Sequence, residues 1–397
     1  MPAPRPATVP ALMTLAFAAG GAAPAAAQLA EASIEAAQKY SAARGGLCLI
    51  VKERGELRYE KYYNGHKPEQ PVHIYSGTKS FFGALAVIAE KDGILSLDER
   101  VAETLPEWRD DPRKAKITIR ELLDFTSGLE TGFQQIYGSS SADKLSLSVG
   151  LQAKRDSGES FIYGPSHLQV FCEVLRRKLK RRGMTYQGYL ERKLIRPLDI
   201  EIAQWRADNH GNVIPSAGMW ITARDWTRFG ETVASGGYYQ GREIVPRDGF
   251  GKCFAGTEVN PAFGLCFWVN RYCREPDARE VDVEEWLDRT PLPEDWRRAC
   301  LSKNAPPDLI CSLGSNFQRL YVVPSMQLVV VHQGRKGAKG FRDADFLAIL
   351  FRDAQVPAAA APAPAGRRTI KPLFPKGFGG FLKKQGQAPA GESSETP

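Results

Sequence analysis

Ser76 and Lys79 place a hydroxyl and an amine three residues apart, directly before the apolar run 80–89. A serine hydroxyl is a weak nucleophile at neutral pH, and it needs a base within hydrogen-bonding distance to form a covalent intermediate. A lysine can serve as that base when its pKa is lowered, and the positive end of a helix dipole lowers the pKa of an amine. The spacing therefore predicts a serine nucleophile with its own lysine base.

Ser76 has an alternative interpretation as a helix cap, and the chain contains a second copy of the motif. Ser76 could simply cap the helix that follows, but a capping box would place Glu or Gln at position 79 instead of a cation. A second Ser-x-x-Lys pattern, Ser141 to Lys144, lies in a polar run that is typical of a loop and has no strong apolar helix behind it. We therefore favour Ser76 over Ser141.

Tyr163 is the candidate for a second proton-transfer group, because it enters a turn just before a predicted helix and carries a hydroxyl. The alternative is an ordinary core tyrosine with a satisfied hydroxyl. The residues alone leave open whether Lys79 or Tyr163 takes the proton from Ser76 during acylation.

His332, Gln333 and Gly334 end the most hydrophobic predicted strand, and a substrate could lie along such a strand end. The histidine could donate a hydrogen bond to a carbonyl or carboxylate, although a lone histidine after an apolar strand is often structural. We expect the backbone N–H groups of Ser76 and Arg335 to form the oxyanion hole.

The elements that must position these residues form an α+β pattern. Strand-like segments near both termini surround a mainly helical middle, which predicts an antiparallel sheet built from both termini, flanked by helices, with an inserted helical domain. The expected helices are 29–44, 80–92, 117–129, 164–182, 186–193, 223–235 and 344–355, and the expected strands are 47–52, 56–63, 264–270, 319–324 and 327–332.

Composition and the two ends of the chain suggest an exported globular enzyme. The 397 residues are 43% hydrophobic, which suits one large domain, expected over 28–355. Residues 1–27 combine Arg5, an apolar stretch and a terminal Ala-Ala-Ala, so we expect a signal peptide cleaved after Ala27 and a periplasmic or secreted protein. Residues 356–397, rich in Pro, Ala, Gly and Lys, are expected to be a disordered tail. No other segment is apolar enough to span a membrane.

The net charge of +8 does not indicate a nucleic-acid partner. The tail holds six lysines and arginines and two glutamates, a net charge of +4, and Arg5 lies in the leader, which leaves about +3 on the folded part. The basic run 176–182 is best explained as a solvated helix face.

Five of the seven cysteines are concentrated in one region of the chain, whereas Cys48 and Cys172 lie in apolar contexts and are expected to be buried thiols. None shows the C-x-x-C spacing of a metal or redox site, and export permits disulfides, so we expect structural bridges, without a predicted pairing. The cysteines concerned are Cys253, Cys266, Cys273, Cys300 and Cys311. The acidic, Pro-rich segment of about 271–310 is expected to be a loop insertion, for which a disulfide-tied surface excursion is favoured over a rim above the site. The helical part is expected at about 76–250 and the sheet part at about 28–75 and 310–355.

Taken in order, the motifs resemble the class C β-lactamase-like serine hydrolases, which include penicillin-binding DD-peptidases, esterases and amide hydrolases. The resemblance covers roughly residues 30–355. It implies that Ser76 forms the acyl-enzyme, that Lys79 and Tyr163 share the proton transfers, and that 332–334 line the substrate. The segments that carry it are 76–79, 126–129, Tyr163, 215–225, the glycines at 236, 237 and 241, and 332–334.

Two departures from the family pattern bear on the substrate. Pro165 stands where the family usually has the Asn of Tyr-x-Asn, and His332-Gln333-Gly334 stands where β-lactamases and peptidases usually have Lys-Thr-Gly. The cation that would hold a substrate carboxylate is therefore missing, and Arg335 is the nearest replacement.

These observations favour a serine hydrolase that acts on a small ester, amide or peptide, without metal or cofactor. The alternatives are a β-lactamase or DD-carboxypeptidase of the same fold, and a non-catalytic scaffold that binds cell-wall peptide or protein.

Overall fold

The computed structural model describes residues 28–138, 143–288 and 292–354. The expected leader (1–27), the expected tail (356–397) and Ser141 lie outside these residues. Within the described ranges, every helix is too short or too polar to cross a membrane.

The main sheet of the described chain has six strands, in the order β2-β1-β13-β12-β11-β8, and every neighbouring pair is antiparallel. The expectation of an antiparallel sheet built from both termini is confirmed, because β1 pairs directly with β13 near the other end of the chain. The strands are β1 (Gly46–Glu53), β2 (Glu56–Tyr62), β8 (Trp268–Val269), β11 (Ile310–Gly314), β12 (Gln318–Val323) and β13 (Leu328–Gly334).

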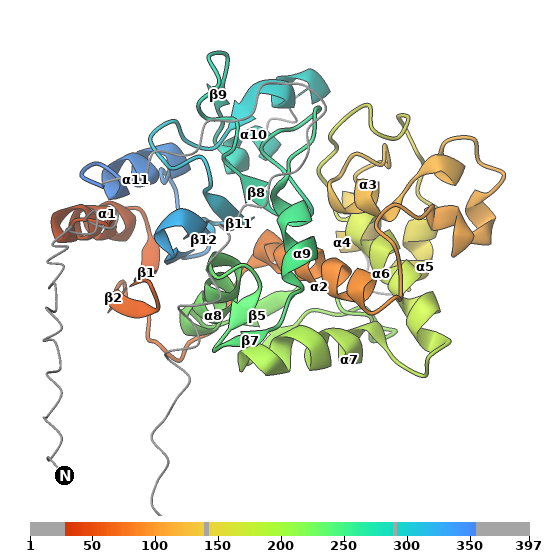
Figure 1. The fold of residues 1–397 in the computed structure, drawn as a ribbon, viewed down its shortest axis with the longest axis horizontal. Helices are drawn as coiled ribbons and strands as arrows, with labels where there is room; N and C mark the ends of the chain where they lie inside the picture. Colours follow the sequence, from red (N-terminus) through yellow and green to blue (C-terminus); the bar gives the residue numbers. More distant parts are fainter. Residues whose placement is uncertain (1–27, 139–142, 289–291, 355–397) are drawn as a thin grey trace, which may run out of the picture.

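Helices cover both faces of this sheet. Side chains alternate along β13, so His332 faces the C-terminal helix α11 (Asp343–Leu350), whereas Val329 packs close to Gly230 of α8 (Ala223–Ala234). Helix α1 (Glu31–Ala43) lies beside α11, although the two helices stand at opposite ends of the described chain (Figure 1).

The inserted helical part lies beyond the face of the main sheet that α8 covers, on the right of Figure 1. Helix α2 passes from the sheet into it, and a Cβ atom at Gly83 would lie 2.2 Å from the Leu265 carbonyl, so α2 packs very closely there. The helices are α2 (Lys79–Lys91), α3 (Ile119–Leu123), α4 (Phe133–Tyr137), α5 (Lys144–Val149), α6 (Ser166–Lys180), α7 (Tyr186–Leu190), α9 (Arg247–Phe250) and, in the later insertion, α10 (Val283–Asp288).

Short strands complete the described chain. They are β3 (Val72–His73), β4 (Gln204–Trp205), β5 (Met219–Ile221), β6 (Tyr238–Tyr239), β7 (Arg242–Glu243), β9 (Arg279–Glu280) and β10 (Ala299–Cys300). In the sheet β3-β5-β4, the central strand β5, which directly precedes α8, pairs with β3 before the Ser76 turn and with β4.

Helix α3 is shorter than expected. It begins with a capping box between Thr118 and Glu121 but ends at Leu123, because the Asp124 side chain accepts hydrogen bonds from the N–H and the hydroxyl of Thr126 and Phe125 turns left-handed. Side-chain hydrogen bonding thus replaces the last turns that the apolar pattern predicted.

The disulfide expectation is wrong. All seven cysteines lie in the described chain, and each is a buried free thiol. Cys253 lies against the Gly83 carbonyl and Cys266 against the Leu123 carbonyl. Cys273 and Cys300 pack together in a small separate apolar cluster as free thiols. The insertion 271–310 is held instead by Asn270, whose buried amide bonds the backbone of Leu301 and Ser302.

Strand β11 was not among the expected strands, yet it lies against the turn that carries Ser76. Ser312 Oγ donates to the Gly77 carbonyl at 3.0 Å, and Ser80 Oγ donates to Ser312 Oγ at 2.9 Å. A Cβ atom at Gly314 would lie 2.0 Å from the Ile74 carbonyl oxygen and 3.1 Å from the Gly77 nitrogen. Only glycine permits this approach.

We expect Gly314→Ala to destabilise the fold by about 2 kcal/mol or more, because the methyl group would overlap a backbone oxygen that cannot rotate away. Gly251→Ala is the matched control, since Gly251 has a helical φ and open space around its Cβ position. Thermal unfolding of both variants measures the difference, and equal melting temperatures would contradict the close packing of β11.

Candidate active site

Ser76 lies within a short 3-10 turn (Tyr75–Thr78) that leads directly into α2. Tyr75 takes a left-handed conformation, with φ of 45°, just before it. The N-cap residue of α2 is Thr78, and neither the turn nor the helix has a side-chain cap. The capping interpretation of Ser76 is therefore wrong.

Lys79 points back to Ser76. Its Nζ donates to Ser76 Oγ at 2.8 Å and to the Ser216 carbonyl at 2.6 Å. Only 3% of Lys79 is exposed, and among the described residues no carboxylate pairs with it. Burial disfavours the ammonium form and lowers the pKa of Lys79 to about 7. A large fraction of this amine is therefore neutral at physiological pH.

Tyr163 comes from the loop before α6 and closes the other side of Lys79, whose Nζ lies 4.9 Å from the Tyr163 ring centroid. Burial raises the pKa of Tyr163 well above its usual value, although the neighbouring Ser76 hydroxyl favours the phenolate. The ring is held by an aromatic cluster that includes Phe125, Phe263 and Trp268. The structure thus brings Ser76, Lys79 and Tyr163 together.

Two residues of this site were not singled out from the sequence. Ser216 supplies the carbonyl that bonds Lys79, and its hydroxyl lies 2.9 Å from the Tyr137 hydroxyl. Ser216 belongs to the segment 215–225 that carried part of the family resemblance, whereas the short helix α4 offered no recognisable signal for Tyr137. Burial raises the pKa of Tyr137 to about 12, so this second phenol also stays protonated at neutral pH.

His332, Gln333 and Gly334 are not brought to Ser76, which corrects the expectation that they line the substrate. Strands β12 and β11 separate β13 from the Ser76 turn. His332 is 1% exposed, stacks on Phe341 and faces α11, and its Nδ1 bonds the Phe317 carbonyl. Gln333 is fully buried between Cys48 and the Ile221 carbonyl, and Gly334 pairs with Gly46 of β1.

The Arg335 N–H cannot be the second oxyanion donor, because it already donates to the Gly45 carbonyl at 2.8 Å. The strand that lies beside the Ser76 turn is β11, so the position expected for 332–334 belongs to Ser312, Leu313 and Gly314. A short apolar run at 309–313, followed by Gly-Ser-Asn, was the signal for this strand. Like 332–334, these three residues contain no lysine or arginine.

An aromatic stack forms the wall beside the Ser76 turn. His73 lies between Tyr75 and Trp220, with ring centroids 3.8 and 3.7 Å away, and its Nε2 contacts the Ala217 carbonyl next to Ser216. All three rings are partly exposed. Such a wall suits a flat or apolar group on a substrate.

Metal ligands do not gather anywhere in the part of the chain that the structure describes: no three His, Cys, Asp or Glu side chains are placed to hold an ion. The chemistry available at Ser76 is that of a hydroxyl, an amine whose pKa is lowered to about 7, and two protonated phenols.

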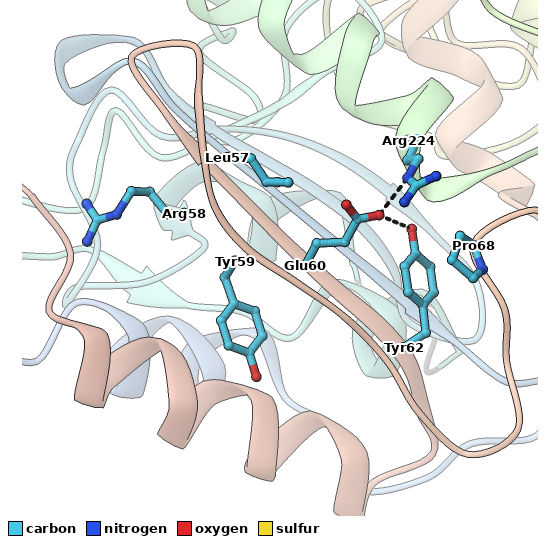
Figure 2. A pocket seen from close by; sticks show the side chains of 7 residues that line it. All are labelled: Leu57, Arg58, Tyr59, Glu60, Tyr62, Pro68 and Arg224. Carbon is cyan, nitrogen blue, oxygen red and sulfur yellow. Dashed lines mark hydrogen bonds and ion pairs between the residues drawn. The ribbon is translucent and has the colours of Figure 1, made fainter.

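A hollow of about 440 Å³ lies elsewhere, over the edge strand β2 (Figure 2). It is lined by Tyr59, Glu60 and Tyr62 among others, and Glu60 accepts hydrogen bonds from Tyr62 and from Arg224 of α8. None of Ser76, Lys79 and Tyr163 lines it, so it is separate from the candidate active site.

Solved structures share this architecture at low sequence identity. A Bacillus anthracis protein provisionally assigned as a 6-aminohexanoate-dimer hydrolase has a TM-score of 0.63 at 18% identity, covering 80% of each chain. The hydrolase EstCE1, described with promiscuous acyltransferase activity, has a TM-score of 0.59 at 15% identity, over 81% of this chain and 98% of its own. A class C β-lactamase of Rhodobacter sphaeroides has a TM-score of 0.55 at 16% identity, over 80% and 97%.

These likenesses show the fold, and a family model shows the family. The model of the Beta-lactamase family matches residues 28–249, which is more than half of the chain and includes Ser76, Lys79 and Tyr163. The chain therefore belongs to the beta-lactamase family, whose fold is shared by esterases, amidases and β-lactamases.

Proposed function

We propose that this protein is an exported serine hydrolase that cleaves a small ester or amide through a covalent acyl-enzyme on Ser76. The observation that carries the proposal is the 2.8 Å contact between Ser76 Oγ and a buried amine that has no carboxylate partner among the described residues. A lysine in this setting is available as a base at neutral pH. The leader-like composition of residues 1–27 supports export.

In the first half of the reaction, Ser76 Oγ attacks the substrate carbonyl while Lys79 Nζ takes the hydroxyl proton. The tetrahedral intermediate collapses, the bond to the leaving group breaks, and Tyr163 donates its proton to that group. Lys79 then returns a proton to Tyr163. This assignment follows from the opposite pKa shifts, since the amine loses its proton near pH 7 and the phenol keeps its own.

In the second half, a water molecule attacks the ester on Ser76. Lys79 takes the water proton, the acid product leaves, and Ser76 recovers its hydroxyl proton from Lys79. Two backbone N–H groups are proposed to hold the oxyanion in both halves: that of Ser76 and that of Ser315, which follows Gly314 at the end of β11.

We expect Ser76→Ala to abolish labelling by a fluorophosphonate probe while the fold stays intact, because the nucleophilic oxygen is gone. Ser141→Ala, which removes the serine of the other Ser-x-x-Lys pattern, is the control and should label like the wild type. Intact-mass spectrometry with circular dichroism measures both. Unchanged labelling of Ser76→Ala would refute the proposal.

The rate should depend on pH through Lys79. With a pKa of about 7, the amine is mostly protonated at pH 5.5 and mostly neutral at pH 8.5, so kcat/KM for a nitrophenyl ester should rise through pH 7 and then level off. Lys79→Arg keeps a permanent cation and should lose at least about 100-fold at every pH. A flat profile between pH 5 and 9 would contradict Lys79 as the base.

Esters should be far better substrates than β-lactams. Because Ser312, Leu313 and Gly314 present no cation beside Ser76, the substrate carboxylate of a cephalosporin gains no charged partner from β11. We expect kcat/KM for nitrophenyl acetate to exceed that for a chromogenic cephalosporin by about 100-fold or more. The reverse order would favour a β-lactamase, and turnover of a D-Ala-D-Ala peptide alone would favour a DD-peptidase.

A further inference from the structure

The turn between β11 and β12 contains two consecutive left-handed residues. Asn316 has φ of 59° and Phe317 has φ of 58°. Asparagine tolerates this conformation through local hydrogen bonds, but phenylalanine has no such compensation. A strained backbone of this kind persists only where the surrounding structure holds it.

Glu284 holds this turn from outside the sheet. It comes from α10, in the insertion 271–310, and its two carboxylate oxygens accept the N–H groups of the strained pair: Oε1 that of Asn316 at 2.6 Å, and Oε2 that of Phe317 at 3.2 Å. Both left-handed residues are therefore bonded by one side chain.

Arg319 connects the same carboxylate to the start of the turn. This side chain is only 1% exposed, and its Nη2 lies 3.1 Å from Glu284 Oε2 while its Nη1 donates to the Gly314 carbonyl at 2.6 Å. On the far side, Arg319 pairs with the buried Asp343 of α11 at 2.7 Å. Glu284 thus bonds the later residues of the turn, and Arg319 bonds the Gly314 carbonyl where the turn begins.

The residues just before the turn pack against the backbone on both sides of Ser76. Gly314 is pressed against the backbone of Ile74 and Gly77, and Ser312 donates to the Gly77 carbonyl. Ser315 lies between Gly314 and Asn316, so a shift of the turn would move its N–H, which is the second oxyanion donor of the proposed function.

We propose that Glu284 is a positioning residue for acyl transfer: by holding Asn316 and Phe317 left-handed, it keeps the end of β11 in register with Ser76. This inference rests on the proposed function and gives the insertion 271–310 a role in it. Glu284 touches neither Ser76 nor Lys79 and takes no proton in the reaction.

The test compares Glu284→Gln with the wild-type full-length protein, using nitrophenyl acetate for turnover and fluorophosphonate labelling to count active sites. Glutamine keeps the shape but cannot accept both N–H groups and pair with Arg319. We expect kcat to fall about 10-fold and KM to change less than about twofold. The apparent pKa in the pH profile of kcat/KM should not change, because Lys79 is untouched. Glu284→Asp, which keeps the charge but not the reach, should lose part of the rate.

Tyr321→Phe is the matched control for a purely structural effect. The Tyr321 hydroxyl donates to Asp343, so this variant weakens the same buried cluster without touching the turn. We expect it to lower the melting temperature and leave kcat per labelled site within about twofold of the wild type.

Phe317→Gly tests the strain itself, because glycine adopts positive φ freely. In the F317G background, Glu284→Gln should cost no more than about threefold in kcat. If kcat of E284Q and of E284D stays within twofold of the wild type, the positioning role is refuted and the proposed function is not. The same conclusion follows if Glu284→Gln still lowers kcat about 10-fold in the F317G background. Failure of the wild type to label at Ser76 would refute the proposed function, and the positioning role with it.

Discussion

Burial of the Lys79 amine, with no carboxylate beside it among the described residues, is the constraint on which the site depends. Each unit of lowered pKa corresponds to about 1.4 kcal/mol by which burial disfavours the cation, and a carboxylate in this place would cancel the effect. The structure satisfies the amine with neutral oxygens only, from Ser76 and Ser216. Packing from α2 and the Tyr163 aromatic cluster excludes the water that would otherwise restore the ordinary pKa.

Close backbone contacts bring distant segments to this amine. Gly77 lies against the Trp226 ring of α8, since a Cβ atom there would stand 2.6 Å from it, and Gly314 lies against Ile74 on the other side. The turn that carries Ser76 is thus clamped between α8 and β11, which come from later parts of the chain. Its left-handed Tyr75 is held by the same packing and by the stack with His73.

Local patterns in the sequence predicted the parts of the molecule whose structure depends on neighbouring residues. The α+β fold, the hairpin of β1 and β2, and helices α1, α2, α6 and α8 followed from apolar periodicity and turn residues. The pairing of Ser76 with Lys79 followed from their spacing, because three residues along a helix return to the same side. Strand β11 was missed because five apolar and small residues give too short a pattern, and α3 was overextended because Asp124 ends it through its side chain.

The errors at the site have one physical origin. His332-Gln333-Gly334 and Ser312-Leu313-Gly314 both end strands in glycine, and nothing local distinguishes a strand end beside Ser76 from one beside α1 and α11. Strand order decides it, through hydrogen bonds between segments far apart in the chain, and the same order engages the Arg335 N–H with Gly45. The free thiols are a similar case, because sequence spacing does not show whether two cysteines meet in the geometry that a disulfide requires.

The sequence by itself determined the family, the fold class and the pairing of the Ser76 hydroxyl with the Lys79 amine, since these depend on residue types and local spacing. Only the tertiary structure decided that the amine is buried without a carboxylate, that Tyr163 and Ser216 surround it, and that β11 lies beside Ser76. Those properties arise from desolvation and strand order, which exist only when segments from the whole chain are packed together.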